Sequence, residues 1–149
     1  MRISNEIDYG LRAMIVIASS KEALVSSKEI SKQYDIPYNF LTLILPRLVK
    51  AGIIASIQGP KGGYKLSKKE TEITFYEIIK ALGTSVEITS CNTEQGCELD
   101  TFCGMTSVWR KLNATIETFL KKATLAEVLM SKECFLEMSK SCSCTTAKK

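Results

Sequence analysis

The sequence predicts a mainly helical protein with one small β-hairpin, in which a compact N-terminal head precedes a long C-terminal helix. Three observations support this prediction. Apolar residues recur at helical spacing through most of the first half of the chain. A short β-branched run is joined to a second short run by a glycine-rich turn. After residue 103, apolar residues step by four, three, four and three, which is the spacing of a coiled-coil seam.

At 149 residues the chain has room for one domain, or for one domain with an appendage. Residues 1–83 contain 12 basic and 8 acidic side chains, whereas residues 84–149 contain 8 of each. The whole net charge of +4 therefore lies in the N-terminal part, as expected for a nucleic-acid-binding head. No signal peptide is evident and no apolar run approaches about 18 residues, so we expect a cytoplasmic protein without a membrane partner.

The first helix is expected over about residues 7–20 and the second over about residues 27–34. The second begins at a capping-box pair, Ser26 and Glu29. Pro37 ends it, because proline disfavours a helical conformation in the residue before it. The buried face of the first helix should consist of Ile7, Leu11, Met14, Ile15 and Ala18.

A third helix is expected over about residues 38–50, before Gly52. Its buried face should consist of Phe40, Leu41, Ile44, Leu45, Leu48 and Val49. Its opposite face carries Asn39, Thr42, Leu43, Pro46 and Lys50. Two helices joined by a tight turn, with small polar residues on the outer face of the second, suggest a helix-turn-helix.

A β-hairpin is predicted after the helix pair. Residues 53–58 and 64–67 form its strands, and the glycine-rich turn between them carries Lys61. A helix-turn-helix followed by a hairpin with a basic tip predicts a winged helix-turn-helix, with the third helix in the major groove of DNA. Another helix should begin after Thr74, which has capping-box spacing to Glu77, and end at Gly83. The DNA-binding domain should therefore occupy residues 1–83.

The head contains candidate contacts to double-stranded DNA. Asn39, Thr42 and Leu43 should face base edges, and Leu43 is able to meet a thymine methyl group. Four other residues should contact mainly phosphates: Ser27, Lys28, Arg47 and Lys61. Gln58, just before the first glycine of the wing, offers at best a neutral contact.

Three cysteines, Cys91, Cys97 and Cys103, lie in the segment of residues 84–103, with five residues between one and the next. All charges of this segment are negative, so it should not contact DNA. Thiolates suit iron–sulfur clusters, zinc or copper(I), and in the cytoplasm such a group is more often a metal or redox site than a disulfide framework. The chain has no histidine, so a fourth ligand would be another cysteine, a carboxylate, a hydroxyl, a backbone group or a small molecule.

The helix after Cys103 is predicted to pair with a second copy of the chain. Its seam consists of Met105, Trp109, Leu112, Ile116 and Phe119. The alternative is an amphipathic helix packed on its own domain, but the rest of the chain offers little to cover such a stripe. The dimerisation helix and a short closing helix should occupy residues 104–138. A disordered tail that contains Cys142 and Cys144 should follow over residues 139–149.

Three motifs, in this order, resemble a known family: the N-terminal MRIS, the wing sequence QGPKGGY at residues 58–64, and the cysteine pattern followed by Trp109-Arg110. Over about residues 1–130 the chain is similar to the iron–sulfur-cluster regulator (IscR) and nitric-oxide-sensing repressor (NsrR) family. The resemblance implies a homodimeric winged-helix transcription factor. It also implies that Cys91, Cys97 and Cys103 bind an iron–sulfur cluster, [4Fe-4S] or [2Fe-2S], beside the dimer helix.

The resemblance also bears on the fourth ligand. The cluster-biogenesis type has a histidine three residues after the third cysteine, where this chain has Thr106. The nitric-oxide-sensing type uses an aspartate in the first helix of the partner subunit, and Asp8 occupies the matching position. A single carboxylate ligand would leave one iron open to exchange with a small molecule, which suits a sensor. From the residues alone, Asp8 is a solvated carboxylate near a helix start.

Three alternatives to a cluster-controlled repressor or activator follow from the residues. The first is a zinc-stabilised or thiol-redox DNA-binding regulator, because three cysteines with Asp8 could hold zinc tetrahedrally. The cysteines could be core filler, although their neighbours are Asn, Thr, Glu, Gln and Asp. An enzyme is disfavoured, because the chain lacks a Cys-x-x-Cys motif, a histidine base and a phosphate-cradling loop. We therefore expect a DNA-binding regulator, not an enzyme, acting on a near-palindromic operator.

Overall fold

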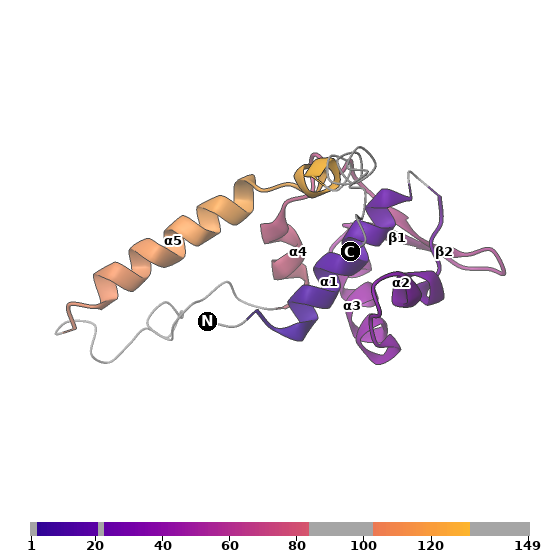
Figure 1. The fold of residues 1–149 in the computed structure, drawn as a ribbon, viewed down its shortest axis with the longest axis horizontal. Coiled ribbons are helices and arrows are strands. Elements are labelled where there is room, and N and C mark those ends of the chain that lie inside the picture. Colours follow the sequence, from indigo (N-terminus) through magenta and orange to yellow (C-terminus); the bar gives the residue numbers. More distant parts are fainter. Residues whose placement is uncertain (1–2, 21–22, 84–102, 132–149) are drawn as a thin grey trace, which may run out of the picture.

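A computed structural model describes residues 3–20, 23–83 and 103–131 of the chain. In chain order the elements are α1 (Asn5–Ser19), α2 (Ser27–Gln33), α3 (Tyr38–Lys50), β1 (Ile54–Ile57), β2 (Gly63–Leu66), α4 (Phe75–Ala81) and α5 (Thr106–Lys122). Residues 125–131 are helical again. The first four helices and the hairpin form one head, and α5 extends away from it (Figure 1). The predicted mainly helical fold with a small hairpin is confirmed.

Helix α1 lies at the centre of the head, where it contacts α2, α3, α4 and β2. Its buried residues are Gly10, Ala13, Met14, Val16 and Ile17. The predicted buried face is confirmed at Met14, which is fully buried, and at Leu11, Ile15 and Ala18, which are partly buried and pack against the core. Ile7 is half-buried. The prediction left out Gly10, Ala13, Val16 and Ile17, because a helix that is packed on several sides buries more than one stripe.

Helices α2 and α3 form the predicted helix pair. The Ser26 hydroxyl accepts a hydrogen bond from the Glu29 N–H at 3.3 Å, and the Glu29 carboxylate accepts one from the Ser26 N–H at 2.8 Å, which confirms the capping box. Helix α3 continues through Pro46. Its inward face is the predicted one, with Phe40 and Val49 partly buried beside the fully buried Leu41, Ile44, Leu45 and Leu48.

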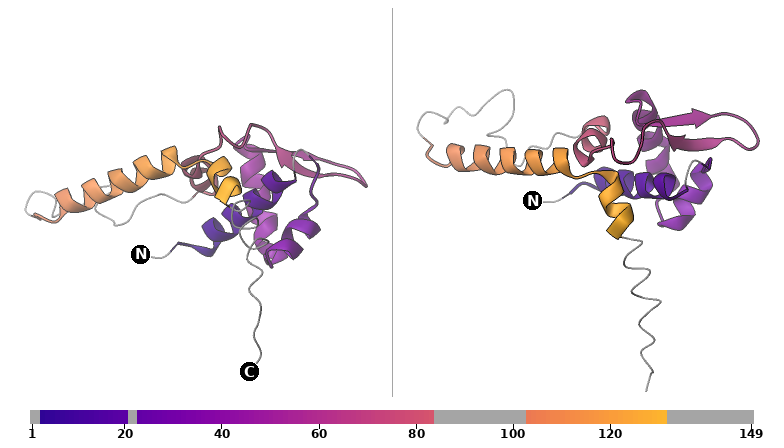
Figure 2. Two further views of the ribbon diagram at one scale, coloured as in Figure 1. Left: turned by 45° about the horizontal axis from the view of Figure 1, so that its top comes forward. Right: turned by 90° about the horizontal axis from the view of Figure 1, so that it is seen from above.

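Strands β1 and β2 pair antiparallel, with Ile57 opposite Gly63 next to the turn. Gly62 is needed in the turn, because a Cβ there would collide with the carbonyl oxygen of Ile57. A bridge between Val25 and Tyr64 attaches the hairpin to the segment before α2. The hairpin projects from the head on the side away from α5 (Figures 1 and 2), so it forms the predicted wing.

Helix α5 is bonded to the head at its C-terminal end. The Phe75 N–H donates a hydrogen bond to the Ala123 carbonyl at 3.0 Å, and the Leu125 N–H donates one to the Ile73 carbonyl at 2.9 Å. The Leu125 side chain is fully buried in the core of the head. The other end of α5, which begins after Cys103, lies away from the head (Figure 2).

Thr74→Ala is expected to lower the free energy of unfolding by about 1 kcal/mol, the usual cost of losing a helix N-cap. The Thr74 hydroxyl accepts a hydrogen bond from the Glu77 N–H at 3.2 Å, at the start of α4. The hydrogen bond from the Thr74 backbone lowers the pKa of Glu77 below its ordinary 4.5. A lowered carboxyl pKa adds stability above the unfolded-state pKa, and this stability is lost as pH falls through the folded-state value.

Urea unfolding of wild type and Thr74→Ala measures the loss. Thr71→Ala is the control, because Thr71 is exposed in the preceding turn and should change stability little. Equal stability of wild type and Thr74→Ala would show that this capping box does not hold the start of α4.

Candidate DNA-binding face and sensor site

The outer face of α3 presents the side chains predicted to meet base edges. Asn39, Thr42 and Leu43 are all exposed, and the Leu43 side chain is 51% exposed. The Thr42 hydroxyl donates a hydrogen bond to the Asn39 carbonyl at 2.7 Å. The face combines an amide, a hydroxyl and an apolar group, which are suited to an adenine edge, a polar base edge and a thymine methyl group respectively.

Tyr38, the first residue of α3, was not predicted as a DNA contact from the sequence. It is 53% exposed, and its hydroxyl lies 3.4 Å from the hydroxyl of Ser27, the first residue of α2. Lys28 is exposed beside Ser27. The starts of α2 and α3 therefore share one polar edge, of the kind that positions a phosphate. The sequence signal that could have indicated this contact was a tyrosine directly after Pro37, next to the polar face of the third helix.

The wing exposes Gln58 and Lys61. In the part of the chain that the structure describes, no carboxylate forms an ion pair with Lys61. Lys61 lies in the turn between the paired residues Ile57 and Gly63, and the hairpin projects from the head (Figure 2), which is the position from which a wing reaches a phosphate.

Lys61→Ala is expected to weaken binding to all DNA sequences by a similar factor and to reduce the salt slope by about 1, because one phosphate contact is lost. Fluorescence anisotropy titrations at several salt concentrations measure both quantities. Lys111→Ala removes the same charge from an exposed position on α5 and should change neither. A changed sequence preference in Lys61→Ala would contradict the phosphate contact.

Arg47, predicted as a phosphate contact, is bonded within the protein. Its Nη1 donates a hydrogen bond to the Leu82 carbonyl oxygen at 2.7 Å and lies 3.3 Å from Oε2 of Glu6. Leu82 is the C-cap residue of α4, and Glu6 lies in the first turn of α1. Arg47 therefore joins the predicted recognition helix to the end of α4 and the start of α1.

Helices α1 and α4 are also packed tightly at Leu82. The Leu82 side chain is 1% exposed, and a Cβ added to Gly10 of α1 would lie 2.5 Å from its Cδ1. Gly83 follows with a φ of 74°, a left-handed conformation that ends the helix. The last residues of α4 are thus fixed against both α1 and α3, immediately before the cysteine-bearing segment of the sequence.

Two of the predicted cluster ligands, Asp8 and Cys103, lie in the described residues. Asp8 is in the first turn of α1, where its Oδ2 lies 2.7 Å from Nη2 of Arg12. Cys103 is a partly buried free thiol just before α5. Cys91 and Cys97 lie outside the described residues. Within the described ranges, no three metal-ligating side chains form a group.

Thr106 begins α5, one turn after Cys103. It is 4% exposed, whereas its neighbours Met105 and Val108 are more than half exposed. Its N–H donates to the Cys103 carbonyl at 3.2 Å, but its buried Oγ1 has no hydrogen-bond partner among the described residues. A buried hydroxyl without a partner is unfavourable, so Thr106 offers a polar group for a ligand near Cys103.

Helix α5 carries an exposed apolar stripe, whose most exposed members are Met105, Val108, Leu112 and Phe119, the last at 68%. The other two members of the predicted seam, Trp109 and Ile116, are half-buried. Val108 was missed because it is not an a or d position of the predicted heptad. At about 100° per residue, however, it lies on the same side of the helix as Met105 and Leu112.

A different side of α5 faces α4. Lys121 lies 4.7 Å from the centroid of the Tyr76 ring, and it pairs with Glu117 at 2.7 Å. The hydrogen bonds from Lys121 and Tyr76 lower the pKa of Glu117. These residues lie about 100° or more around the helix from the seam residue Ile116, so their contacts with Tyr76 lie outside the apolar stripe.

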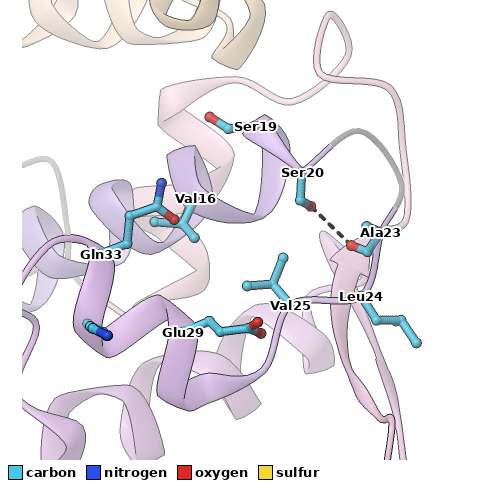
Figure 3. A pocket seen from close by; sticks show the side chains of 9 residues that line it. Val16, Ser19, Ser20, Ala23, Leu24, Val25, Glu29 and Gln33 are labelled. Carbon is cyan, nitrogen blue, oxygen red and sulfur yellow. Dashed lines mark hydrogen bonds between the residues drawn. The ribbon is translucent and has the colours of Figure 1, made fainter.

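A cavity of about 580 Å³ lies where the end of α1 meets α2 (Figure 3). The Ser20 hydroxyl at its edge donates to the Ala23 carbonyl at 3.0 Å. Glu29 also lines it, but hydrogen bonds from the Ser26 backbone and side chain hold this carboxylate and lower its pKa. These polar groups stabilise the fold, and we assign the cavity no ligand.

Comparisons with known proteins agree with this architecture. The Rrf2 family, described as iron-dependent transcriptional regulators, matches residues 3–131. The HTH-type transcriptional regulator IscR of Vibrio cholerae is 35% identical over 140 residues, which cover 93% of this chain and 80% of that protein. The protein of the same name from Pectobacterium carotovorum is 36% identical over 134 residues, 89% of this chain and 82% of that one.

Two solved structures are also similar. The structure named T. potens IscR has a TM-score of 0.71 and 27% identity, and the match covers 100% of this chain and 94% of that one. CymR, the global cysteine regulator of B. subtilis, has a TM-score of 0.71 and 26% identity, over 86% of this chain and 95% of that one. In the described part of this chain, no helix has the length and apolar composition needed to cross a bilayer. The family match and the winged-helix head together show that the chain belongs to the Rrf2 family of transcriptional regulators.

Proposed function

We propose that this transcriptional regulator is a homodimer whose binding to operator DNA in the cytoplasm is controlled by an iron–sulfur cluster. The observation that carries the proposal is the placement of α5. One end of this helix is hydrogen-bonded to the head, and the other begins next to Cys103 (Figure 1). The helix thus connects a predicted ligand to the DNA-binding head. The family description, which names iron, supports the choice of metal.

The proposed ligands are Cys91, Cys97 and Cys103 of one subunit and the partner subunit's Asp8. The described residues fit such a group at two points. Cys103 supplies a free thiol, and thiolates are the usual ligands of iron–sulfur clusters. The hydroxyl of Thr106, which has no hydrogen-bond partner among the described residues, is able to donate a hydrogen bond to a sulfur atom nearby. When bound, the cluster would supply an iron that exchanges ligands or electrons with small molecules.

Asp8 is suited to connect two subunits. Arg12 holds one of its carboxylate oxygens, and a carboxylate has lone pairs enough for a second partner. Because Asp8 lies in the first turn of α1, a bond from it to the other subunit's cysteine segment would tie the two heads together. The spacing of the two recognition helices would then be fixed, at about 34–36 Å for half-sites one helical turn apart.

The DNA-binding face completes the proposal. Asn39, Thr42 and Leu43 meet base edges in the major groove, while Ser27, Lys28 and Lys61 contact phosphates. Gln58 makes a neutral contact from the wing. Tyr38, exposed beside Ser27, is added to this set. Two such faces related by a two-fold axis would recognise a near-palindromic operator.

The direct test is anaerobic purification followed by visible absorption, iron and sulfide counting, and DNA binding before and after exposure to nitric oxide or oxygen. A visible band, bound iron and sulfide, and a change in DNA affinity on exposure would support the proposal. A colourless protein with bound zinc would overturn it in favour of a zinc regulator. A metal-free protein that responds to disulfide formation would favour a thiol switch, and the similar CymR of Staphylococcus aureus has been crystallised in an oxidized form.

Asp8→Ala is expected to retain a cluster, because three thiolates remain, but to react differently with nitric oxide and to lose the cluster sooner in air. A carboxylate is a harder and weaker ligand of iron than a thiolate. Its removal therefore changes the iron atom that exchanges ligands with small molecules. Stopped-flow absorption with nitric oxide and the lifetime of the visible band measure the effect. Glu70→Ala removes an exposed carboxylate from the segment between β2 and α4 and serves as the control. Identical spectra, lifetimes and DNA binding in Asp8→Ala and wild type would remove Asp8 from the ligand set.

A further inference from the structure

We infer that Arg47 is a positioning residue that couples the sensor to the recognition helix, and that it does not act mainly through a DNA phosphate. The inference rests on the proposed function and names the contact through which the proposed site is regulated. One nitrogen atom of Arg47, Nη1, contacts both the Leu82 carbonyl oxygen, at 2.7 Å, and the Glu6 carboxylate, at 3.3 Å. Arg47 lies on α3, between the base-facing residues and the end of that helix.

Both partners of Arg47 adjoin the segments that carry the proposed ligands. Leu82 is followed by Gly83 and then by the cysteine-bearing segment of residues 84–103. Glu6 shares the first turn of α1 with Asp8. A change at either part of the ligand set therefore acts on a residue that Arg47 contacts directly.

Leu82 packs directly against α1. Its side chain is 1% exposed, and its Cδ1 lies 2.5 Å from the place that a Cβ on Gly10 would occupy. Its carbonyl lies at the C-terminal end of α4, where the unpaired carbonyl groups carry partial negative charge and attract a cation. A shift of α4 relative to α1 would move this carbonyl and break or lengthen its bond to Arg47.

Arginine suits this position for a chemical reason. Its planar guanidinium group stays charged and offers several donors in a fixed geometry, so it is able to bind a carbonyl and a carboxylate at once. Lysine offers a single ammonium group on a flexible stem and would not fix the orientation of α3 in the same way. The pair of contacts gives α3 two arrangements, held and released, which the sensor biases.

The experiment measures coupling rather than affinity alone. The probe is a fluorescein-labelled duplex selected from a random-sequence pool by the cluster-loaded wild type. Dissociation constants are measured by anisotropy for cluster-loaded and cluster-free protein, and their ratio is compared among wild type, Arg47→Met, Arg47→Lys and Glu6→Gln. Lys61→Ala is the control for a residue that contacts only phosphate, and circular dichroism checks that each variant is folded.

The wild-type ratio should differ from one by at least about fivefold, the lower end of ordinary allosteric coupling. In Arg47→Met the ratio should fall close to one, and Arg47→Lys and Glu6→Gln should give intermediate ratios. Lys61→Ala should weaken both forms equally and keep the wild-type ratio. If Arg47→Met did not fold, the ratio of dissociation constants in Glu6→Gln would test the inference instead. This variant should fold, because Glu6 is partly exposed and glutamine keeps the shape of the side chain.

Two other results have distinct meanings. If Arg47→Met and Glu6→Gln both kept the wild-type ratio, the inference would be overturned, and a lower salt slope in Arg47→Met would then make Arg47 a phosphate contact. A wild-type ratio of one would instead overturn the proposed function, because the cluster would have no effect on DNA binding to transmit.

Discussion

Cys97→Ala is expected to purify anaerobically without the visible absorption of an iron–sulfur cluster and to bind operator DNA at least about fivefold more weakly than the cluster-loaded wild type. Alanine offers no ligand, and the two remaining thiolates with one carboxylate cannot replace a soft donor of iron. Residues 84–103 contain four carboxylates and few apolar side chains, so without a metal the segment has little to stabilise it. The connection between the two heads would then be lost.

Absorption spectra, iron counting and anisotropy titrations of the same preparations measure this effect. The control is Cys142→Ala, which removes a thiol from the predicted tail and should keep both the colour and the affinity. Loss of colour in both variants would mean that the ligand set extends to the tail. Full colour in Cys97→Ala would show that the cysteine pattern does not hold the cluster.

Features that depend on neighbours in sequence were predictable. Both capping boxes are present, because each needs only two residues three positions apart. The buried and exposed faces of α3 agree with the prediction, because its apolar residues repeat at helical spacing and its polar face stays exposed. The ion pair of Asp8 with Arg12 is also local, since residues four apart on a helix are adjacent, but it was not predicted.

Features that depend on how helices meet were not predictable. The buried residues of α1 that were not predicted, such as Val16 and Ile17, follow from its contacts with several elements, which the helical periodicity does not reveal. Arg47 looked like a phosphate contact because it lies near the exposed face of the recognition helix. Its contact with Leu82 joins residues 35 positions apart and uses a backbone carbonyl, which no side-chain pattern reveals. The sequence also did not reveal that the Thr106 hydroxyl is buried without a hydrogen-bond partner in the described part of the chain.

Ile116→Asp is expected to convert the proposed dimer to monomers. The half-buried residue lies in the predicted seam of α5, about 100° around the helix from Glu117, which is hydrogen-bonded to Tyr76 of α4. In the dimer each aspartate would be buried opposite an apolar surface without a cation, at a cost of about 3 kcal/mol or more. That cost raises the dimer dissociation constant by a factor of more than about 100. Sedimentation velocity at micromolar concentration measures the change.

Thr118→Asp is the matched control, because it places the same charge two residues away on an exposed position on the other side of α5. It should remain dimeric, whereas Ile116→Asp should also lose most of its operator affinity, because a single head contacts only one half-site. The stripe of Met105, Val108, Leu112 and Phe119 would then stay exposed to water, and the monomer should bind hydrophobic dyes more strongly than wild type. A dimer that survives in Ile116→Asp would place the subunit interface elsewhere, and α5 would no longer connect Cys103 of one subunit to the other subunit's head.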